Sequence, residues 1–140
     1  MTALHDDQQA ALIEAARDAR RHAYTPYSHF AVGAALLAAD GRIFPGCNIE
    51  NAAYSSTVCA ERVALLSAYA AGARDVVALA VVADTPGPVS PCGTCRQVMF
   101  ELAPHATVIL ANMADARFVT TPRELLPHGF EPSDMDSART

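Results

Sequence analysis

The sequence predicts an α/β protein organised as a three-layer α-β-α sandwich around one mixed sheet. Two observations lead to this fold class. Segments with helical spacing alternate along the chain with short apolar runs of strand length, in the order helix, hairpin, helix, strand, helix, strand. Residues 76–82 are apolar at every position, which is typical of a strand buried on both faces by helices above and below the sheet.

Length and composition fit one domain. The chain has 140 residues, of which 51% are hydrophobic. It is long enough for one compact core and too short for two ordinary domains. We therefore expect a single domain over residues 1–140.

The first half of the chain predicts a helix followed by a hairpin. Residues 7–22 carry apolar side chains at helical spacing among charged neighbours, which indicates an amphipathic helix. Residues 30–38 predict a buried strand, and the turn signal at 39–41 leads into a second strand from 42 to about 48.

The second half alternates between helices and strands. Residues 59–72 predict a helix that stops at Gly72, and the apolar strand 76–82 follows. A short helix over 96–103 and a strand over 107–110 come next. Near the C-terminus, Pro122 is placed to begin one more short helix.

The charge balance limits the partners. The formal net charge is −5, from 10 Lys and Arg against 15 Asp and Glu. Nucleic acids and membrane surfaces are polyanionic and favour a basic face, so we expect neither as a partner and favour a small neutral or cationic ligand. All the basic residues counted are Arg, which excludes Schiff-base chemistry and a P-loop lysine.

The sequence pattern favours the cytoplasm. No stretch approaches the roughly 20 continuous apolar residues of a membrane-spanning helix, and the N-terminal residues lack a basic-then-apolar signal pattern. In a reducing compartment the four cysteines are expected to remain free of disulfides. Their spacing therefore has to be tested against metal binding and catalysis.

Three of the cysteines have a metal-binding pattern. Cys92 and Cys95 form a CxxC element, and at the start of a helix their sulfurs would lie about one turn apart on the same face. Cys59 also begins a predicted helix, so the three thiolates could converge where two helix N-termini meet. Three protein ligands with an open position are typical of a catalytic zinc ion.

Two charged residues next to Cys59 fit this interpretation. Glu61 is close enough to act as a base and acid without being a ligand. Arg62 could donate hydrogen bonds to the sulfurs and withdraw negative charge from an all-thiolate centre. Together with Pro91 before the CxxC element, the Cys-x-Glu pattern matches the signature of zinc nucleobase deaminases.

The main alternative is a closed, structural zinc site with Cys47 as its fourth ligand. Cys47 has no partner at CxxC spacing and falls on a predicted strand, where a buried free cysteine is ordinary packing. We therefore expect Cys47 to lie outside the metal site.

At this point the chain resembles the small, tetrameric cytidine deaminase family over nearly its whole length. Several ordered motifs carry the resemblance, and together they are far more specific than any one of them. They are Pro26-Tyr27-Ser28 with Phe30 to Ala35, Gly46 to Ala52, Cys59-Ala60-Glu61-Arg62, Pro91 to Gln97, and Leu125-Leu126-Pro127 with Phe130.

The resemblance implies a mixed sheet of about five strands, one Zn²⁺ per subunit and a role for each matching residue. The implied zinc ligands are Cys59, Cys92 and Cys95, and the implied proton shuttle is Glu61. The implied substrate contacts are Asn48 and Glu50 at the sugar, the backbone of Ala60 at the base, Phe30 as an aromatic wall, Tyr54, and Phe130 from a neighbouring subunit of a homotetramer. Two departures from the family pattern are Ala31 and Ser55-Ser56. The Ser55-Ser56 pair directly follows Tyr54 and could alter the loop that places Tyr54 as a substrate contact.

The expected reaction is hydrolytic deamination of cytidine and deoxycytidine to uridine and deoxyuridine with release of ammonia, as in pyrimidine salvage. Free nucleosides are favoured over nucleotides because Glu50 would repel a phosphate. The alternatives are a zinc deaminase of another small aminonucleoside, which the Asn48-x-Glu50 pair disfavours, and a zinc-stabilised binding module without turnover. An RNA or DNA editor is disfavoured by the acidic composition.

Overall fold

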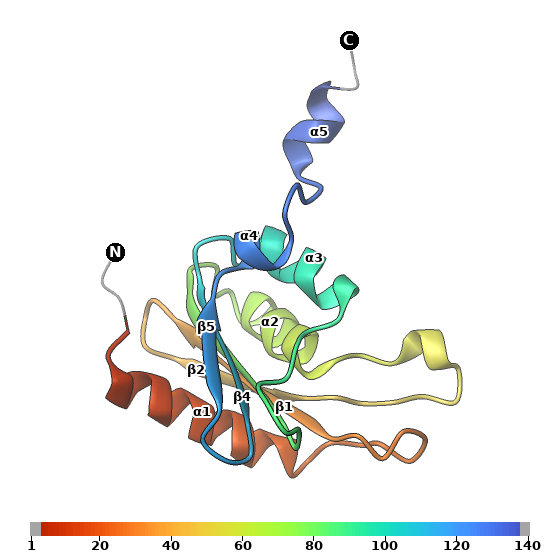
Figure 1. Ribbon diagram of the computed structural model, residues 1–140. Coiled ribbons are helices and arrows are strands. Elements are labelled where there is room, and N and C mark those ends of the chain that lie inside the picture. Colours follow the sequence, from red (N-terminus) through yellow and green to blue (C-terminus); the bar gives the residue numbers. More distant parts are fainter. Residues whose placement is uncertain (1–3, 138–140) are drawn as a thin grey trace.

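A computed structural model describes residues 4–137 of the chain as a mixed five-stranded sheet with helices on both faces (Figure 1). The strands lie in the order β2-β1-β3-β4-β5. Only β3 and β4 run parallel, and the other neighbours are antiparallel. The elements are α1 (Asp6–Arg20), β1 (Val32–Ala38), β2 (Ile43–Cys47), the 3₁₀ helix η1 (Tyr54–Ser56), α2 (Ala60–Ala70), β3 (Val76–Ala83), α3 (Gly93–Leu102), β4 (Thr107–Asn112), β5 (Arg117–Thr120), α4 (Pro122–Leu125) and α5 (Pro132–Ser137).

Helix α1 covers one face of the sheet. Its apolar stripe includes Leu12, Ile13 and Ala16, all buried, and packs on the small side chains that β1, β3 and β4 present to this face. Small residues on this face of the sheet let α1 lie close to the strands. At Gly33 a Cβ atom would come within 2.0 Å of the Ala16 carbonyl oxygen.

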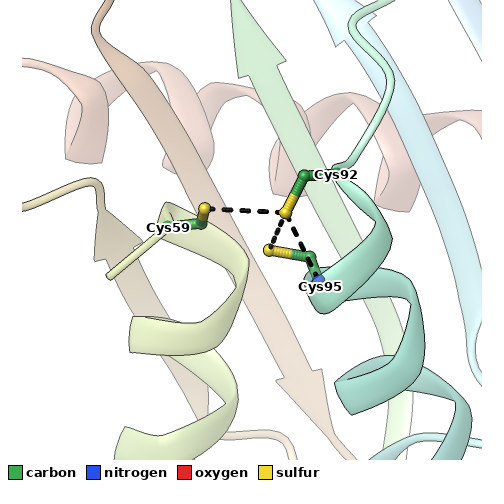
Figure 2. Close-up of side chains that lie close together, drawn as sticks. All are labelled: Cys59, Cys92 and Cys95. Carbon is green, nitrogen blue, oxygen red and sulfur yellow. Dashed lines mark hydrogen bonds between the residues drawn. The ribbon is translucent and has the colours of Figure 1, made fainter. Parts of the chain in front are cut away.

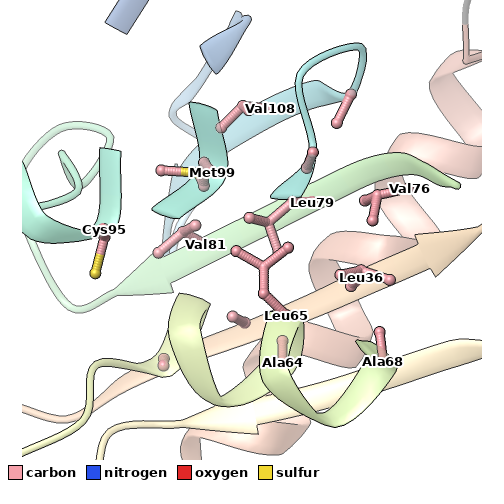
Figure 3. Close-up of a cluster of buried hydrophobic side chains, with 14 of the residues drawn as sticks. Leu36, Ala64, Leu65, Ala68, Val76, Leu79, Val81, Cys95, Met99 and Val108 are labelled. Atoms are coloured by element: carbon pink, nitrogen blue, oxygen red, sulfur yellow. The ribbon is translucent and has the colours of Figure 1, made fainter. Parts of the chain in front are cut away.

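Helices α2 and α3 cover the opposite face with a larger core. Leu36, Leu65, Leu79 and Met99 are completely buried there. In Figure 3 the side chain of Leu65 points from α2 toward Leu79 on β3. Burial of each such side chain contributes about 1.5–3 kcal/mol to folding, so this layer fixes where α2 and α3 begin relative to the sheet.

The central strand β3 is buried over most of its length, as its apolar sequence predicts. Alternate side chains enter the two cores: Leu79 and Val81 face α2 and α3, and Ala80 and Val82 face α1. The sheet thus separates two cores, and the prediction of a three-layer α/β sandwich is confirmed.

The element boundaries differ from prediction in informative places. Strand β1 begins at Val32 instead of residue 30, because the Asn48 side chain accepts a hydrogen bond from the Val32 N–H and donates one to the Phe30 carbonyl. Helix α3 begins at Gly93 instead of residue 96, because the Cys92 sulfur accepts the N–H of Cys95 and caps the helix.

Three short elements were not located by the sequence pattern. They are η1, β5 and α5. The β5 strand has four residues, three of them exposed, on the edge of the sheet, so it lacks the apolar run that marked β3 and β4. Among residues 4–137, no helix is long and apolar enough to cross a membrane.

Candidate functional site

The sulfurs of Cys59, Cys92 and Cys95 form one compact cluster. All three Sγ atoms lie within 4.8 Å of one another. Cys92 is 3.8 Å from Cys59 and 3.4 Å from Cys95, sulfur to sulfur. Figure 2 shows the three side chains pointing toward one another from the starts of α2 and α3. The predicted convergence of these cysteines is confirmed.

Helix geometry brings the sulfurs together. Cys59 is the N-cap of α2 and Cys92 is the N-cap of α3, while Cys95 lies in the first turn of α3. The unpaired N–H groups at two helix starts give this region a positive potential that favours thiolates. Three thiolates within reach of one ion are a donor set that suits zinc and leaves a coordination position open.

Charge at the cluster is compensated by Arg62. Its guanidinium donates to the Cys59 sulfur at 3.4 Å, as the sequence had suggested. A hydrogen bond from Cys95 and further bonds from Arg62 and Cys92 lower the pKa of Cys59 to about 5. The bond with Cys59 and the burial of its own sulfur raise the pKa of Cys95, so Cys59 is the more acidic of the two thiols.

Glu61 is a buried carboxyl group beside this cluster. It lies in the first turn of α2 and is only 4% exposed. Burial raises its pKa, with a further contribution from the negative charge of Cys59. A carboxyl group with a raised pKa at the wall of a cavity is suited to accepting and donating protons.

A cavity of about 280 Å³ opens next to the cluster. This is just below the roughly 300–1,000 Å³ of sites for drug-sized ligands, so it suits a small metabolite. The predicted site residues among its lining are Phe30, Asn48, Glu50, Tyr54, Cys59, Ala60, Glu61 and Cys92. Segments far apart in the sequence therefore meet around one space.

Glu50 and Asn48 lie just beyond the end of β2 and not within it. The Glu50 carboxylate accepts the N–H groups of Tyr27 and Ser28 at 3.0 and 3.1 Å and also the Ser28 hydroxyl. The hydroxyl bond is the main cause that lowers the pKa of Glu50, so this carboxylate is ionised. The Asn48 amide is engaged with the backbone of Phe30 and Val32.

Two further predictions concern residues outside this cavity. Phe130 is 56% exposed and does not line it; its carbonyl oxygen accepts a hydrogen bond from Gln97 on α3. Cys47 is not part of the sulfur cluster. It pairs with Gly33, whose missing side chain would face α1, so Cys47 points to the opposite face of the sheet from the cluster.

Sequence reasoning missed several residues that line the cavity. The polar ones are Ser28, Thr57 and Ser90. Ser28 lies inside a motif that carried the family resemblance, two residues before Phe30, and that position was the available signal. Val81 was included only in the apolar run of a predicted strand, because nothing in the sequence shows that a core strand also reaches the cavity.

The fold and the site define a class of protein: a zinc-binding hydrolytic deaminase with a small-molecule pocket. The protein-family model of the cytidine and deoxycytidylate deaminase zinc-binding region matches residues 6–111 of this chain. The chain is 57% identical over 126 residues to the cytidine deaminase of Halalkalibacterium halodurans, covering 89% of this chain and 96% of that protein. It is 39% identical over 124 residues to the cytidine deaminase of Mycobacterium tuberculosis, covering 89% and 90%.

Solved structures agree with these relatives. A crystal structure of cytidine deaminase from Burkholderia pseudomallei is 56% identical and superposes with a TM-score of 0.85, covering 86% of this chain and 98% of that one. The Mycobacterium tuberculosis cytidine deaminase structure gives 36% identity and a TM-score of 0.76, covering 88% and 97%. The chain belongs to the cytidine and deoxycytidylate deaminase family.

Proposed function

We propose that this chain deaminates cytidine and deoxycytidine by hydrolysis. One observation carries the proposal: two thiols of the cluster, Cys59 and Cys92, and the buried carboxyl of Glu61 line the same cavity as Asn48 and Glu50. One part of the cavity wall thus offers groups for water activation and proton transfer, and another offers polar groups for a sugar.

Zinc would be held by Cys59, Cys92 and Cys95, one ion per subunit. When bound, it supplies a Lewis acid that makes water a nucleophile near neutral pH. The Arg62 guanidinium beside Cys59 offsets part of the thiolate charge, which keeps an all-thiolate centre electron-poor enough for this task.

Glu61 is proposed as the proton shuttle. Its carboxyl group lines the cavity and burial raises its pKa, which suits a group that both accepts and donates a proton. It would take the proton from the attacking water and deliver protons to the pyrimidine ring nitrogen and to the departing ammonia. Attack at C4 forms the C–O bond, and loss of ammonia breaks the C–N bond.

The remaining lining groups would hold the nucleoside. Ala60 is the first residue of α2, so its N–H has no acceptor within the helix and is free for the base. Phe30 and Tyr54 present exposed rings at the cavity. Asn48 and Glu50 would contact the sugar hydroxyls, with Glu50 as a fixed, ionised acceptor.

Charge favours nucleosides over nucleotides. Within the described part of the chain, the residues lining the cavity include Glu50 and Glu61 and no Arg. A 5′-phosphate would therefore enter a negative environment without a compensating cation. Recycling of nucleosides through pyrimidine salvage, in the cytoplasm, is the corresponding role.

The functional unit is proposed to be a homotetramer with shared active sites, each built on a single-domain subunit. In Figure 1 the C-terminal segment that ends in α5 extends away from the sheet. Phe130 lies between α4 and α5, exposed and outside its own chain's cavity. These features support a role for Phe130 in the site of a neighbouring subunit.

A parallel assay tests the proposal. Purified, zinc-loaded protein is mixed with cytidine, deoxycytidine and CMP, and the loss of cytosine absorbance is followed with product analysis. We expect turnover of both nucleosides and at least tenfold lower kcat/KM for CMP, since one uncompensated charge contact costs more than about 1.4 kcal/mol. Preference for CMP, or turnover of an unrelated aminonucleoside alone, would contradict the substrate assignment.

A further inference from the structure

The hydroxyl group of Ser28 joins two groups of the proposed nucleoside site. It donates its one proton to the Glu50 carboxylate and accepts the N–H of Phe30 at 3.0 Å. A hydroxyl that donates to one fixed partner and accepts from another has its rotation fixed as well. Ser28 therefore connects the orientation of the Glu50 carboxylate to the position of Phe30 through two hydrogen bonds.

Little else fixes Phe30. Its ring is 44% exposed, so core packing does not hold it in place. Its backbone is instead held from both sides, at the N–H by Ser28 and at the carbonyl by Asn48 Nδ2 at 2.8 Å. The preceding residue, His29, has a positive φ of 58°, a conformation that non-glycine residues adopt rarely and that these hydrogen bonds must maintain.

The Glu50 carboxylate depends on the same segment. Its Oε1 atom accepts two backbone N–H groups, from Tyr27 and Ser28, and its Oε2 atom faces the Ser28 hydroxyl. Without that hydroxyl, Oε2 would lose its donor and the carboxylate could turn about the Oε1 contacts. The lone pair left for a ligand would then no longer point in one fixed direction.

We propose that Ser28 is a positioning residue for nucleoside recognition, holding Glu50 toward the sugar hydroxyls and Phe30 beside the base. This inference rests on the proposed function. It predicts an effect on substrate binding that depends on the sugar hydroxyls, whereas zinc and Glu61 on the α2 side of the cavity stay unchanged.

The test compares Ser28→Ala with wild type on deoxycytidine and on 2′,3′-dideoxycytidine, which differs from deoxycytidine only by lacking the 3′-hydroxyl of the sugar. We expect Ser28→Ala to raise KM for deoxycytidine about tenfold, because the Glu50 carboxylate loses a charge-assisted hydrogen bond that fixes its orientation. The value of kcat should change less than threefold. With the dideoxy substrate the rise in KM should be at most threefold, because only the support of Phe30 is then affected and Asn48 still holds the Phe30 carbonyl.

Two variants complete the experiment. Ser28→Thr keeps the hydroxyl and should restore KM for deoxycytidine to within threefold of wild type. Ser67→Ala, on the exposed side of α2, is the matched serine control and should leave both substrates unaffected. If Ser28→Ala fails to fold, Ser28→Cys keeps the size with a weaker donor and is measured in its place.

The outcomes distinguish failure of the proposed function from failure of the role of Ser28. Loss of turnover by wild-type protein on both nucleosides would contradict the proposed function itself. An active wild type with an unchanged KM in Ser28→Ala, or with the same rise in KM on both substrates, would overturn the role of Ser28 alone. A fall in kcat with unchanged KM would also overturn it.

Discussion

Gly46 on β2 touches the backbone of Ala60 at the start of α2. A Cβ atom at Gly46 would lie 2.4 Å from the Ala60 carbonyl oxygen and 2.7 Å from the Ala64 nitrogen. Both are backbone atoms, which cannot move aside as a flexible side chain can. The absence of a side chain at Gly46 thus sets how deeply the first turn of α2 sits on the sheet, and this turn follows Cys59 and carries Glu61.

Gly46→Ala is therefore expected to weaken metal binding as well as the fold. Displacing the turn that follows Cys59 should lower zinc affinity about 10- to 100-fold, the range seen when groups that orient metal ligands are changed. Overpacking should also cost about 1–3 kcal/mol of stability. Competition with a zinc chelator and denaturant unfolding measure the two effects.

Gly33→Ala is the matched control for Gly46. Its Cβ would clash with the backbone of α1, on the other face of the sheet and away from the cysteines. It should destabilise the protein while zinc affinity and kcat per bound zinc remain close to wild type. Equal loss of zinc affinity in both variants would show that the effect of Gly46 is only general destabilisation.

Glu61→Gln tests the proton shuttle. We expect kcat to fall by at least about 100-fold, the lower range for loss of a general acid–base group. Zinc content should remain one per subunit, and the melting temperature should not decrease, because the substitution removes an ionisable group from a buried position. Turnover within tenfold of wild type would refute this role.

A comparison of Cys47→Ser with Cys92→Ser tests whether Cys47 is the fourth ligand of the zinc ion. Cys47 points to the α1 face, so its substitution should leave zinc content unchanged. Cys92→Ser removes a member of the sulfur cluster and should abolish stoichiometric zinc. Metal analysis of both purified proteins gives the answer, and zinc loss in Cys47→Ser would indicate a closed site.

Glu50 should make the free energy of unfolding depend on pH in the acidic range. Its pKa is lowered from the usual 4.5, chiefly by the Ser28 hydroxyl, so the folded state favours the ionised form. The stabilisation is fully present above about pH 4.5 and is lost as the pH falls through the lowered folded-state value. Glu50→Gln, compared with wild type at equal zinc loading, should show a shallower loss of unfolding free energy below pH 4.5. Parallel curves would count against this assignment.

Sharing of active sites can be tested by mixing two defective chains. Phe130→Ala should reduce activity at least about tenfold if its ring buries against substrate. In a 1:1 assembly with Glu61→Ala chains, half the sites keep Glu61 and half of those receive an intact Phe130, so activity should recover to about one quarter of wild type. Co-expressed Glu61→Ala and Cys92→Ser chains are the control and should recover nothing, because both lesions fall within one chain's own site.

The sequence was informative where a residue's environment follows from local pattern. The all-apolar run of β3 and the N-terminal cysteines of α2 and α3 were predicted because burial and helix starts leave clear local signals. The four-residue, mostly exposed β5 leaves no such signal and was missed. Its pairing with β4 is decided by tertiary contacts.

The substrate side of the cavity was harder to predict for a similar reason. The second strand was expected to run to about residue 48, yet β2 ends at Cys47, so Asn48 and Glu50 both follow it and their side chains are engaged with the loop before β1. The role of Ser28 depends on hydrogen bonds across 22 residues of sequence. Such contacts exist only once the loop and the strand end are folded against each other.

The order of elements along the chain gives the cysteine cluster a second consequence. Cys59 precedes β3 and Cys92 follows it, 33 residues later, so an ion held by both closes a loop that contains all of α2 and the central strand. Closing a loop of this length restricts the unfolded chain as a covalent cross-link would. Zinc bound at this cluster would therefore also cross-link the starts of α2 and α3, and its removal should lower the stability of the whole fold.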